Sequence, residues 1–259
     1  MAQNSFDLLP LWVIYIGFLI LFFLSVELGF TICRTRRNGD PKVNESRKLH
    51  GRIVLGGIFT LVAFLLAFTF SMAGSQYSTR RNLILDHANA IGSTYLRSKP
   101  MPEPHRSKIN NLLQEYAKIR FNIDEDNFTD MMQTTERLEQ QIWTEAILIT
   151  QKDNSPIVSI FLQSLNEMID LHAKRLNIIR WTRIPLMMIL TLAFIATILM
   201  VLYGYILGLG KRRDIITRSV LILAFATVFL LVIDLDRPHG GIFKISQQPM
   251  VEVYKSMTK

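Results

Sequence analysis

The residue types most capable of chemistry in this sequence are its five histidines. None of them pairs with another histidine, a cysteine or a carboxylate at a recognised metal-binding spacing. The five are His50, His87, His105, His172 and His239. The sequence also contains no Gly-rich phosphate loop, nucleophile elbow or paired catalytic carboxylates. We therefore expect no enzymatic activity, no metal site and no cofactor, and we expect the histidines to be solvated or interfacial polar residues.

One acidic residue stands inside an apolar segment. Glu27 is the only charged residue between Leu8 and Cys33. An ionisable group within a membrane span is costly and is a functional-site candidate by default. The alternative is that Glu27 reaches the interface or pairs with Arg34 or Arg36, and the sequence leaves both interpretations open.

A second apolar segment carries a row of large side chains. Thr60, Phe64, Phe68 and Met72 recur every four residues, which places them on one side of a helix. Small residues that allow close helix packing lie beside this row, at Gly56, Ala63, Ala67, Ser71 and Gly74. The row could line a hydrophobic constriction that gates a pore. The alternative is that it faces lipid or a neighbouring helix.

The chain beyond this segment is predicted to continue as the same helix. A polar stripe follows at spacings of three and four, formed by Asn82, Asp86, Asn89, Ser93 and Arg97. Such a stripe could line a hydrated vestibule. Arg80 and Arg81 stand where the vestibule would meet the constriction, and positive charge there would raise the local concentration of anions.

These residues are positioned by four long apolar runs. A helix needs roughly 20 apolar residues to cross a hydrocarbon core. We therefore predict an all-α membrane protein with transmembrane helices over 8–33, 53–75, 184–209 and 219–235. The last run is short and spans only if Ile215, Ile216 and Leu235 are recruited. Basic loops are predicted at 34–52 and 210–218, and a tail at 236–259.

A helical, water-facing domain is predicted between the second and third spans. Residues 76–183 contain nearly equal numbers of basic and acidic residues, which argues against a nucleic-acid surface. Three prolines, Pro100, Pro102 and Pro104, end its first helix. Ser155 followed by Pro156 predicts the start of its last helix, which we expect to run toward the third span with a kink at Pro185.

The distribution of basic residues predicts the orientation. The loop 34–52 has seven basic and two acidic residues, and the loop 210–218 is also basic. Cytoplasmic loops are the basic ones. We therefore expect a multi-pass protein with the termini and the helical domain outside the cytoplasm, which is the periplasm if the membrane is a bacterial inner membrane, as the resemblance described next implies.

Several short motifs resemble those of a family of bacterial membrane proteins called bestrophin-like. The motifs lie over 66–73, 80–81, 86–92, 95–97, 102–106, 235–238, 241–242 and 245–246. Bestrophins proper are oligomeric anion channels whose second transmembrane helix lines a hydrophobic neck and whose helical domain is cytoplasmic. This sequence lacks their acidic calcium clasp. The resemblance thus implies a homo-oligomeric anion channel in the lipid bilayer, with the opposite orientation to that predicted from charge. The alternative function is a non-enzymatic envelope sensor or scaffold that acts through its helical domain.

Overall fold

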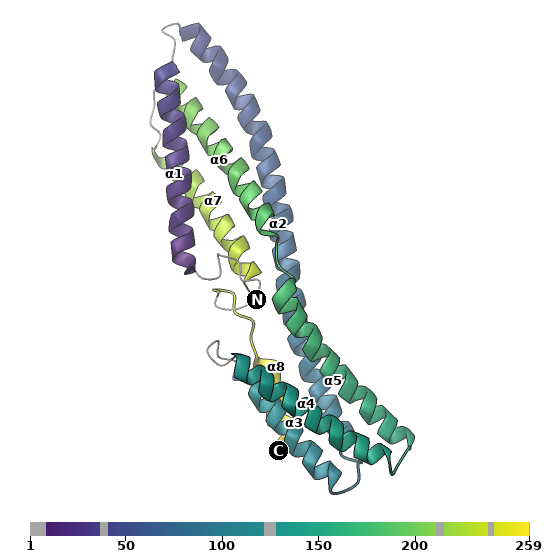
Figure 1. Ribbon diagram of the computed structural model, residues 1–259. Coiled ribbons are helices and arrows are strands. Elements are labelled where there is room, and N and C mark those ends of the chain that lie inside the picture. Colours follow the sequence, from purple (N-terminus) through teal and green to yellow (C-terminus); the bar gives the residue numbers. More distant parts are fainter. Residues whose placement is uncertain (1–8, 37–40, 122–127, 211–214, 238–240, 259) are drawn as a thin grey trace. The chain divides into compact units, whose positions relative to one another are not determined.

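The chain folds into helices, and no strand occurs in the part that the structure describes (Figure 1). This computed structural model describes residues 9–36, 41–121, 128–210, 215–237 and 241–258. The predicted all-α class is confirmed. Residues group into a transmembrane unit, Met1–Tyr77 with Arg183–Lys244, and a helical unit, Ser78–Thr182 with Ile245–Lys259. The helix α2 contributes residues to both units.

Four helices are long and apolar enough to cross a membrane. They are α1 (Leu11–Arg36), α2 (Pro41–Ser98), α6 (Leu186–Leu209) and α7 (Ile215–Asp236). The shortest, α7, has 22 residues, so it is about 33 Å long and exceeds a hydrocarbon core of about 30 Å. It does so by including Ile215, Ile216 and Leu235, as predicted.

Glycines bring α1 and α6 into close contact within the transmembrane unit. A Cβ atom added at Gly204 would lie 2.0 Å from the carbonyl oxygen of Val26, and one added at Gly29 would lie 1.9 Å from that of Val201. Small residues permit such backbone approach in lipid. By contrast, no described atom lies within 4 Å of a Cβ added at Gly56 or Gly74. Within the described chain, such close packing is made by α1 and α6, and these two glycines of the second span meet no neighbour.

The helix α2 is longer than the predicted second span and its extension. It has 58 residues and begins at Pro41, so most of the predicted loop 34–52 is helical. No proline interrupts it after Pro41, and Pro100 follows its end at Ser98. A proline cannot continue a helix, because it lacks an amide hydrogen and its ring clashes with the preceding turn.

A break separates the last helix of the helical unit from the third span. The helix α5 (Pro156–Trp181) ends four residues before α6 begins, and Pro185 occupies the N-cap position of α6. The amide of Ile184, which precedes the proline, donates to Asp236 Oδ1 at 2.9 Å rather than to a helical carbonyl. The expectation of one kinked helix is therefore wrong. The two helices are separate, and the amide of Ile184 between them is hydrogen-bonded by the Asp236 carboxylate instead of by a helical carbonyl.

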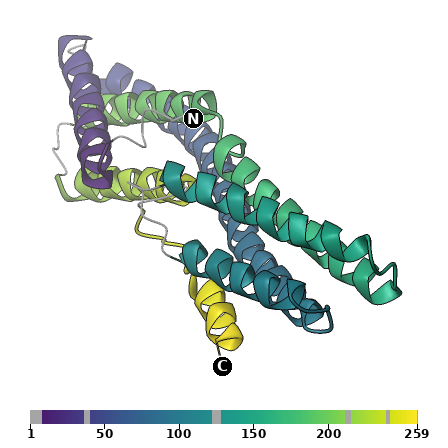
Figure 2. The same cartoon turned by 60° about the horizontal axis from the view of Figure 1, so that its bottom comes forward.

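The helical unit packs its remaining helices around a buried apolar core. These are α3 (His105–Phe121), α4 (Phe128–Thr150), α5 and a C-terminal helix, α8 (Gln248–Met257). In Figure 2 the helix α8 lies beside α3. The carbonyl of Met257 accepts hydrogen bonds from Tyr95 Oη at 3.0 Å and Gln114 Nε2 at 2.9 Å. The predicted C-terminal tail thus includes a helix that is anchored in this unit.

Candidate functional site

The predicted constriction residues lie on a face of α2 that the chain itself leaves uncovered. Thr60 is exposed, and Phe64 and Phe68 are 67% and 54% exposed. Met72 is half-buried and packs against the core of the transmembrane unit. Only 17% of the most apolar stretch of α2 is buried, against 28% in each of the other three spans. The least covered span therefore carries the phenylalanine row.

The predicted vestibule residues are also on the surface of their own unit. All five polar stripe residues are exposed, at Asn82, Asp86, Asn89, Ser93 and Arg97. The two arginines differ, because Arg81 is exposed whereas Arg80 is only 5% exposed. The structure therefore puts Arg81 on an accessible surface, and it buries Arg80 instead of presenting it at a mouth.

Glu27 pairs with a basic residue of the fourth span. Its Oε2 atom accepts a hydrogen bond from Arg218 Nη1 at 2.9 Å. The guanidinium of Arg218 also lies 4.9 Å from the centroid of the Phe23 ring, at which distance the aromatic face stabilises a cation. The pair links α1 to α7, so this ion pair is made by Arg218, 191 residues away, and not by the local candidates Arg34 or Arg36.

An acidic residue near the end of α7, Asp234, binds the backbone of the segment that follows this helix. The Asp234 carboxylate accepts the amides of Ile242 and Phe243 at 2.9–3.2 Å. A Cβ added at Gly241 would lie 2.3 Å from Asp234 Oδ1, so a side chain there would block this contact. These contacts give Gly241 and Ile242, which belong to the bestrophin-like sequence motifs, a structural role.

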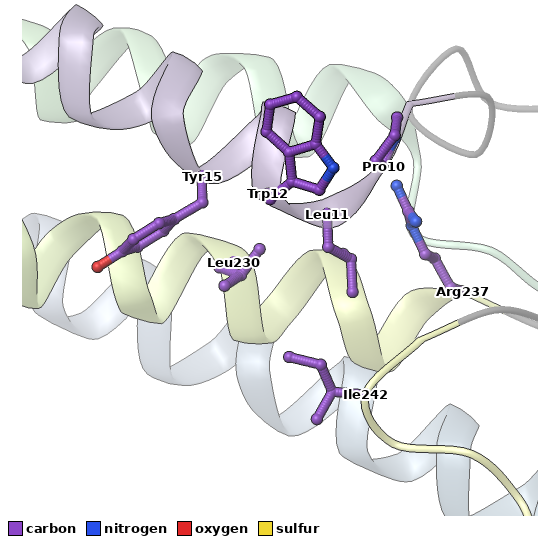
Figure 3. Close-up of a pocket in the computed structure, with 7 residues that line it drawn as sticks. All are labelled: Pro10, Leu11, Trp12, Tyr15, Leu230, Arg237 and Ile242. Atoms are coloured by element: carbon purple, nitrogen blue, oxygen red, sulfur yellow. The ribbon is translucent and has the colours of Figure 1, made fainter.

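An apolar groove runs along α1 and α7 in the transmembrane unit. Figure 3 shows the residues that line it, Pro10, Leu11, Trp12, Tyr15, Leu230, Arg237 and Ile242. The single charged side chain among them, Arg237, donates a hydrogen bond to the carbonyl of Leu9. The groove therefore offers apolar contacts around an arginine that already fastens the start of α1.

A chain of hydrogen-bonded polar side chains lies inside the helical unit. His87 Nε2 is 3.0 Å from Tyr116 Oη, and that hydroxyl donates to Glu139 Oε1 at 3.0 Å. His172 Nδ1 is 2.5 Å from the same carboxylate oxygen, and Arg120 Nη2 donates to Tyr116 Oη at 3.3 Å. The single hydroxyl proton goes to Glu139, so His87 Nε2 must be the donor in its own bond.

Ring contacts and a second arginine complete this buried polar cluster. The imidazole rings of His87 and His172 are parallel, with centroids 6.1 Å apart. The Arg120 guanidinium lies 5.0 Å from the centroid of the Tyr116 ring, and Arg175 Nη2 donates to Gln247 Oε1 at 3.0 Å. Both histidines, Tyr116 and both arginines are at most 6% exposed. Side chains from α2, α3, α4 and α5 thus meet away from water.

Burial controls the protonation of this cluster. Desolvation raises the pKa of the Tyr116 phenol well above its usual range, so the hydroxyl stays protonated. Desolvation, with the nearby charge of Arg120, lowers the pKa of Arg175 to about 10, which leaves it charged at neutral pH. Desolvation also lowers the pKa of His172, against the opposing hydrogen bond to Glu139.

The expectation of solvated or interfacial histidines is wrong for three of the five. His87, His172 and His105 are buried, and His105 Nδ1 is bonded to Glu145 Oε2 at 2.6 Å. His50 is exposed, and His239 lies outside the described residues. Over the described ranges, no three His, Cys, Asp or Glu side chains are grouped so that they could hold a metal ion.

The sequence did contain a signal for the cluster. In three helices the apolar residues that form the core are spaced three or four apart, and the same spacing continues into polar residues. On α3 the run is Ile109, Leu113, Tyr116 and Arg120; on α5 it is Leu165, Met168, His172 and Arg175; on α2 it is Ile84, His87 and Ile91. Residues at these spacings share one helix face, so the polar members were predictable as buried.

Comparisons with known proteins agree with this architecture. The family model described as Bestrophin-like domain matches residues 20–250. Among solved structures, a tyrosine-to-alanine variant of a bestrophin homologue from Klebsiella pneumoniae has a TM-score of 0.68 at 14% identity and covers 93% of this chain and 97% of its own. A tryptophan-to-alanine variant of a bestrophin homologue from the same organism has a TM-score of 0.67 at 14% identity, over 98% and 96%. No curated protein shows a significant sequence match.

Proposed function

We propose that this chain, which belongs to the bestrophin-like family, assembles into a homo-oligomeric anion channel whose pore is lined by α2. The observation that carries the proposal is the uncovered phenylalanine row of α2. Phe64 and Phe68 are more than half exposed within one chain, although the same helix buries Val62 and Leu66 on its other side. The helix therefore has one face toward its own chain and one face that needs another neighbour.

Lipid or other copies of the chain could cover this face, and continuity of the stripe favours other copies. Beyond the row, the exposed face of α2 carries Asn82, Asp86, Asn89 and Ser93, with Arg97 at its end. A ring of copies that surround this face would place an apolar constriction next to a polar, hydrated section. Lipid contact explains the phenylalanines but gives no role to a polar stripe in register with them.

Anion preference is proposed from exposed positive charge. Arg81 is accessible, and repetition of it around a ring would raise the local concentration of anions. Arg80 is buried and is therefore removed from this part of the proposal. Asp86 lies on the same exposed face and opposes the effect, so selectivity should be modest.

Flux measurements test the lining role. A hydrophobic ring gates by dewetting, so shortening it should ease permeation. We expect the double variant Phe64→Ala and Phe68→Ala, reconstituted in liposomes, to pass chloride several-fold faster than the wild-type protein. The matched control is Phe194→Ala, because Phe194 on α6 is equally exposed at 65% but lies outside the row. Equal flux in all three proteins would remove α2 from the pore.

The oligomeric state separates the channel from the rival function. A monomer has too few spans to enclose a pore, so a purely monomeric particle in detergent would favour a non-enzymatic sensor or scaffold that acts through the helical unit. A ring of copies in which Phe64 side chains meet at the axis would support the channel.

The orientation is a separate part of the proposal. The basic residues of the short loops favour a periplasmic helical unit and periplasmic termini, whereas the family resemblance implies a cytoplasmic helical unit. A periplasm-active reporter fused after Lys259 should be active and a cytoplasm-active one silent. The reverse pair of results would establish the cytoplasmic orientation, and it would leave the lining role of α2 untouched.

A further inference from the structure

We propose that the buried polar cluster of the helical unit is a binding site for a small monovalent anion of the halide class, held by Arg120 and Arg175. The proposal does not rest on channel activity. Both arginines are more than nine-tenths buried, and so are the two histidines beside them. Charged groups are rarely buried this far unless a partner of opposite charge accompanies them.

The charges of the cluster do not balance among the residues that the structure describes. Arg120 and Arg175 bring two positive charges, and the hydrogen-bonded network contains one carboxylate, Glu139. That carboxylate is engaged by His172 and Tyr116, and no ion pair joins it or any other described carboxylate to either arginine. The excess is one positive charge, which one monovalent anion would neutralise.

Unused hydrogen-bond donors support the same assignment. Arg120 Nε and Arg175 Nη1 are buried and have no hydrogen-bond partner. Native proteins leave few such groups, and each one calls for a bound water, an ion or a functional role. Water would accept hydrogen bonds from these donors but would leave the excess positive charge uncompensated. An anion accounts both for the unpartnered donors and for the excess charge.

The two arginines exclude a cation from the cluster, although the neighbouring histidines could attract one. His87 Nδ1 and His172 Nε2 are also buried without a partner, and a pair of imidazole nitrogens could suggest a metal. Two guanidinium groups within the same cluster repel a divalent ion, and their own charge then remains uncompensated. The two ring nitrogens are better suited to accept hydrogen bonds from water that accompanies the anion.

The close apolar packing around the cluster favours a small ion over a large one. The core that encloses the cluster is formed by fully buried apolar side chains, including Ile91, Leu113, Phe161 and Met168. A halide needs only donors around one atom, whereas an extended oxyanion or a carboxylate would have to displace this packing.

Hydrogen exchange of the full-length protein in detergent tests the site. The probe is sodium chloride against sodium gluconate at equal ionic strength, followed at the most protected amides of α3, α4 and α5. A ligand that binds only the folded state lowers the opening equilibrium by a factor of 1 + [L]/Kd, so chloride at about ten times Kd should slow exchange about elevenfold. Identical exchange in both salts would overturn the proposal.

Two variants locate the effect. The chloride effect should vanish in Arg175→Gln and persist in Arg137→Gln, because Arg137 is an exposed arginine of α4 in the same unit and belongs to neither the cluster nor the polar stripe. A chloride effect of full size in Arg175→Gln would overturn the site. If that variant does not fold, bromide in crystals of the wild-type protein decides: an anomalous peak beside both guanidinium groups supports the proposal, and its absence refutes it. Neither result depends on ion flux, so the channel proposal stands or fails separately.

Discussion

Removal of one hydroxyl group should destabilise the helical unit without disturbing its packing. Tyr116→Phe keeps the ring, whose side chain is only 1% exposed, and deletes an oxygen that makes three hydrogen bonds. Glu139 keeps its bond from His172, but His87 Nε2 and Arg120 Nη2 lose their acceptor. Leaving a buried donor unsatisfied costs about 1–3 kcal/mol. The bond from Arg120 is long, at 3.3 Å, so we expect about 2–4 kcal/mol in total.

Hydrogen exchange of the intact protein measures this loss in the helical unit alone. A loss of about 2–4 kcal/mol should accelerate the most protected amides of α3 and α4 by roughly 30-fold to several hundredfold. The matched control is Tyr95→Phe, which deletes one hydroxyl with one bond, to the carbonyl of Met257. It should cost about 1 kcal/mol and accelerate exchange about fivefold. If Tyr116→Phe exchanges no faster than Tyr95→Phe, the cluster does not stabilise this unit as argued.

Three further outcomes are expected. Gly204→Ala would place a Cβ atom 2.0 Å from the Val26 carbonyl oxygen, so it should lower the melting temperature in detergent by about 3–10 °C, whereas Gly56→Ala should leave it unchanged. Acidification from about pH 7.5 to about pH 5.5 should destabilise the helical unit in gluconate. The pKa of His172 is lower in the folded state, so the unfolded chain binds protons first as the pH falls. The groups that surround this imidazole are Arg120, Arg175, His87, Tyr116 and Glu139. His172→Gln should therefore flatten the dependence of stability on pH. Asp234→Asn should loosen the segment after α7, seen as faster cleavage by protease near Ile242, because a neutral amide accepts the two backbone bonds more weakly.

The sequence was sufficient for the elements that depend on apolar length and on helix breakers. Four long runs predicted four spans, and the recruitment of Ile215 and Leu235 into the last one followed from the length that a membrane requires. The extension of the second span beyond Ser75 followed from the lack of proline before Pro100. Each of these inferences uses residues that are close together in the chain.

Pairings between distant residues were not accessible in the same way. The partner of Glu27 is Arg218, and Gly204 meets Val26, because α1 lies against both α6 and α7. Helix length and hydropathy do not specify which helices are neighbours. The predicted site on α2 is a related case: the four-residue spacing places Phe64 and Phe68 on one face, but it does not say what covers that face.

The buried cluster shows where periodicity could have been used further. The spacing that identified Ile109 and Leu113 as core residues of one helix continues to Tyr116 and Arg120, and a residue at a core position is buried whatever its polarity. A charged side chain in such a register predicts a partner from another helix, but the sequence does not identify that partner. Even the contact that Tyr116 makes in this cluster is with Glu139, which is 23 residues away. In this fold the carboxylate of the cluster, Glu139, bonds to a histidine and a tyrosine instead of the arginines. The partner that core periodicity demands for Arg120 and Arg175 is therefore missing from the described chain, and this is the physical reason to look for it in solution as an anion.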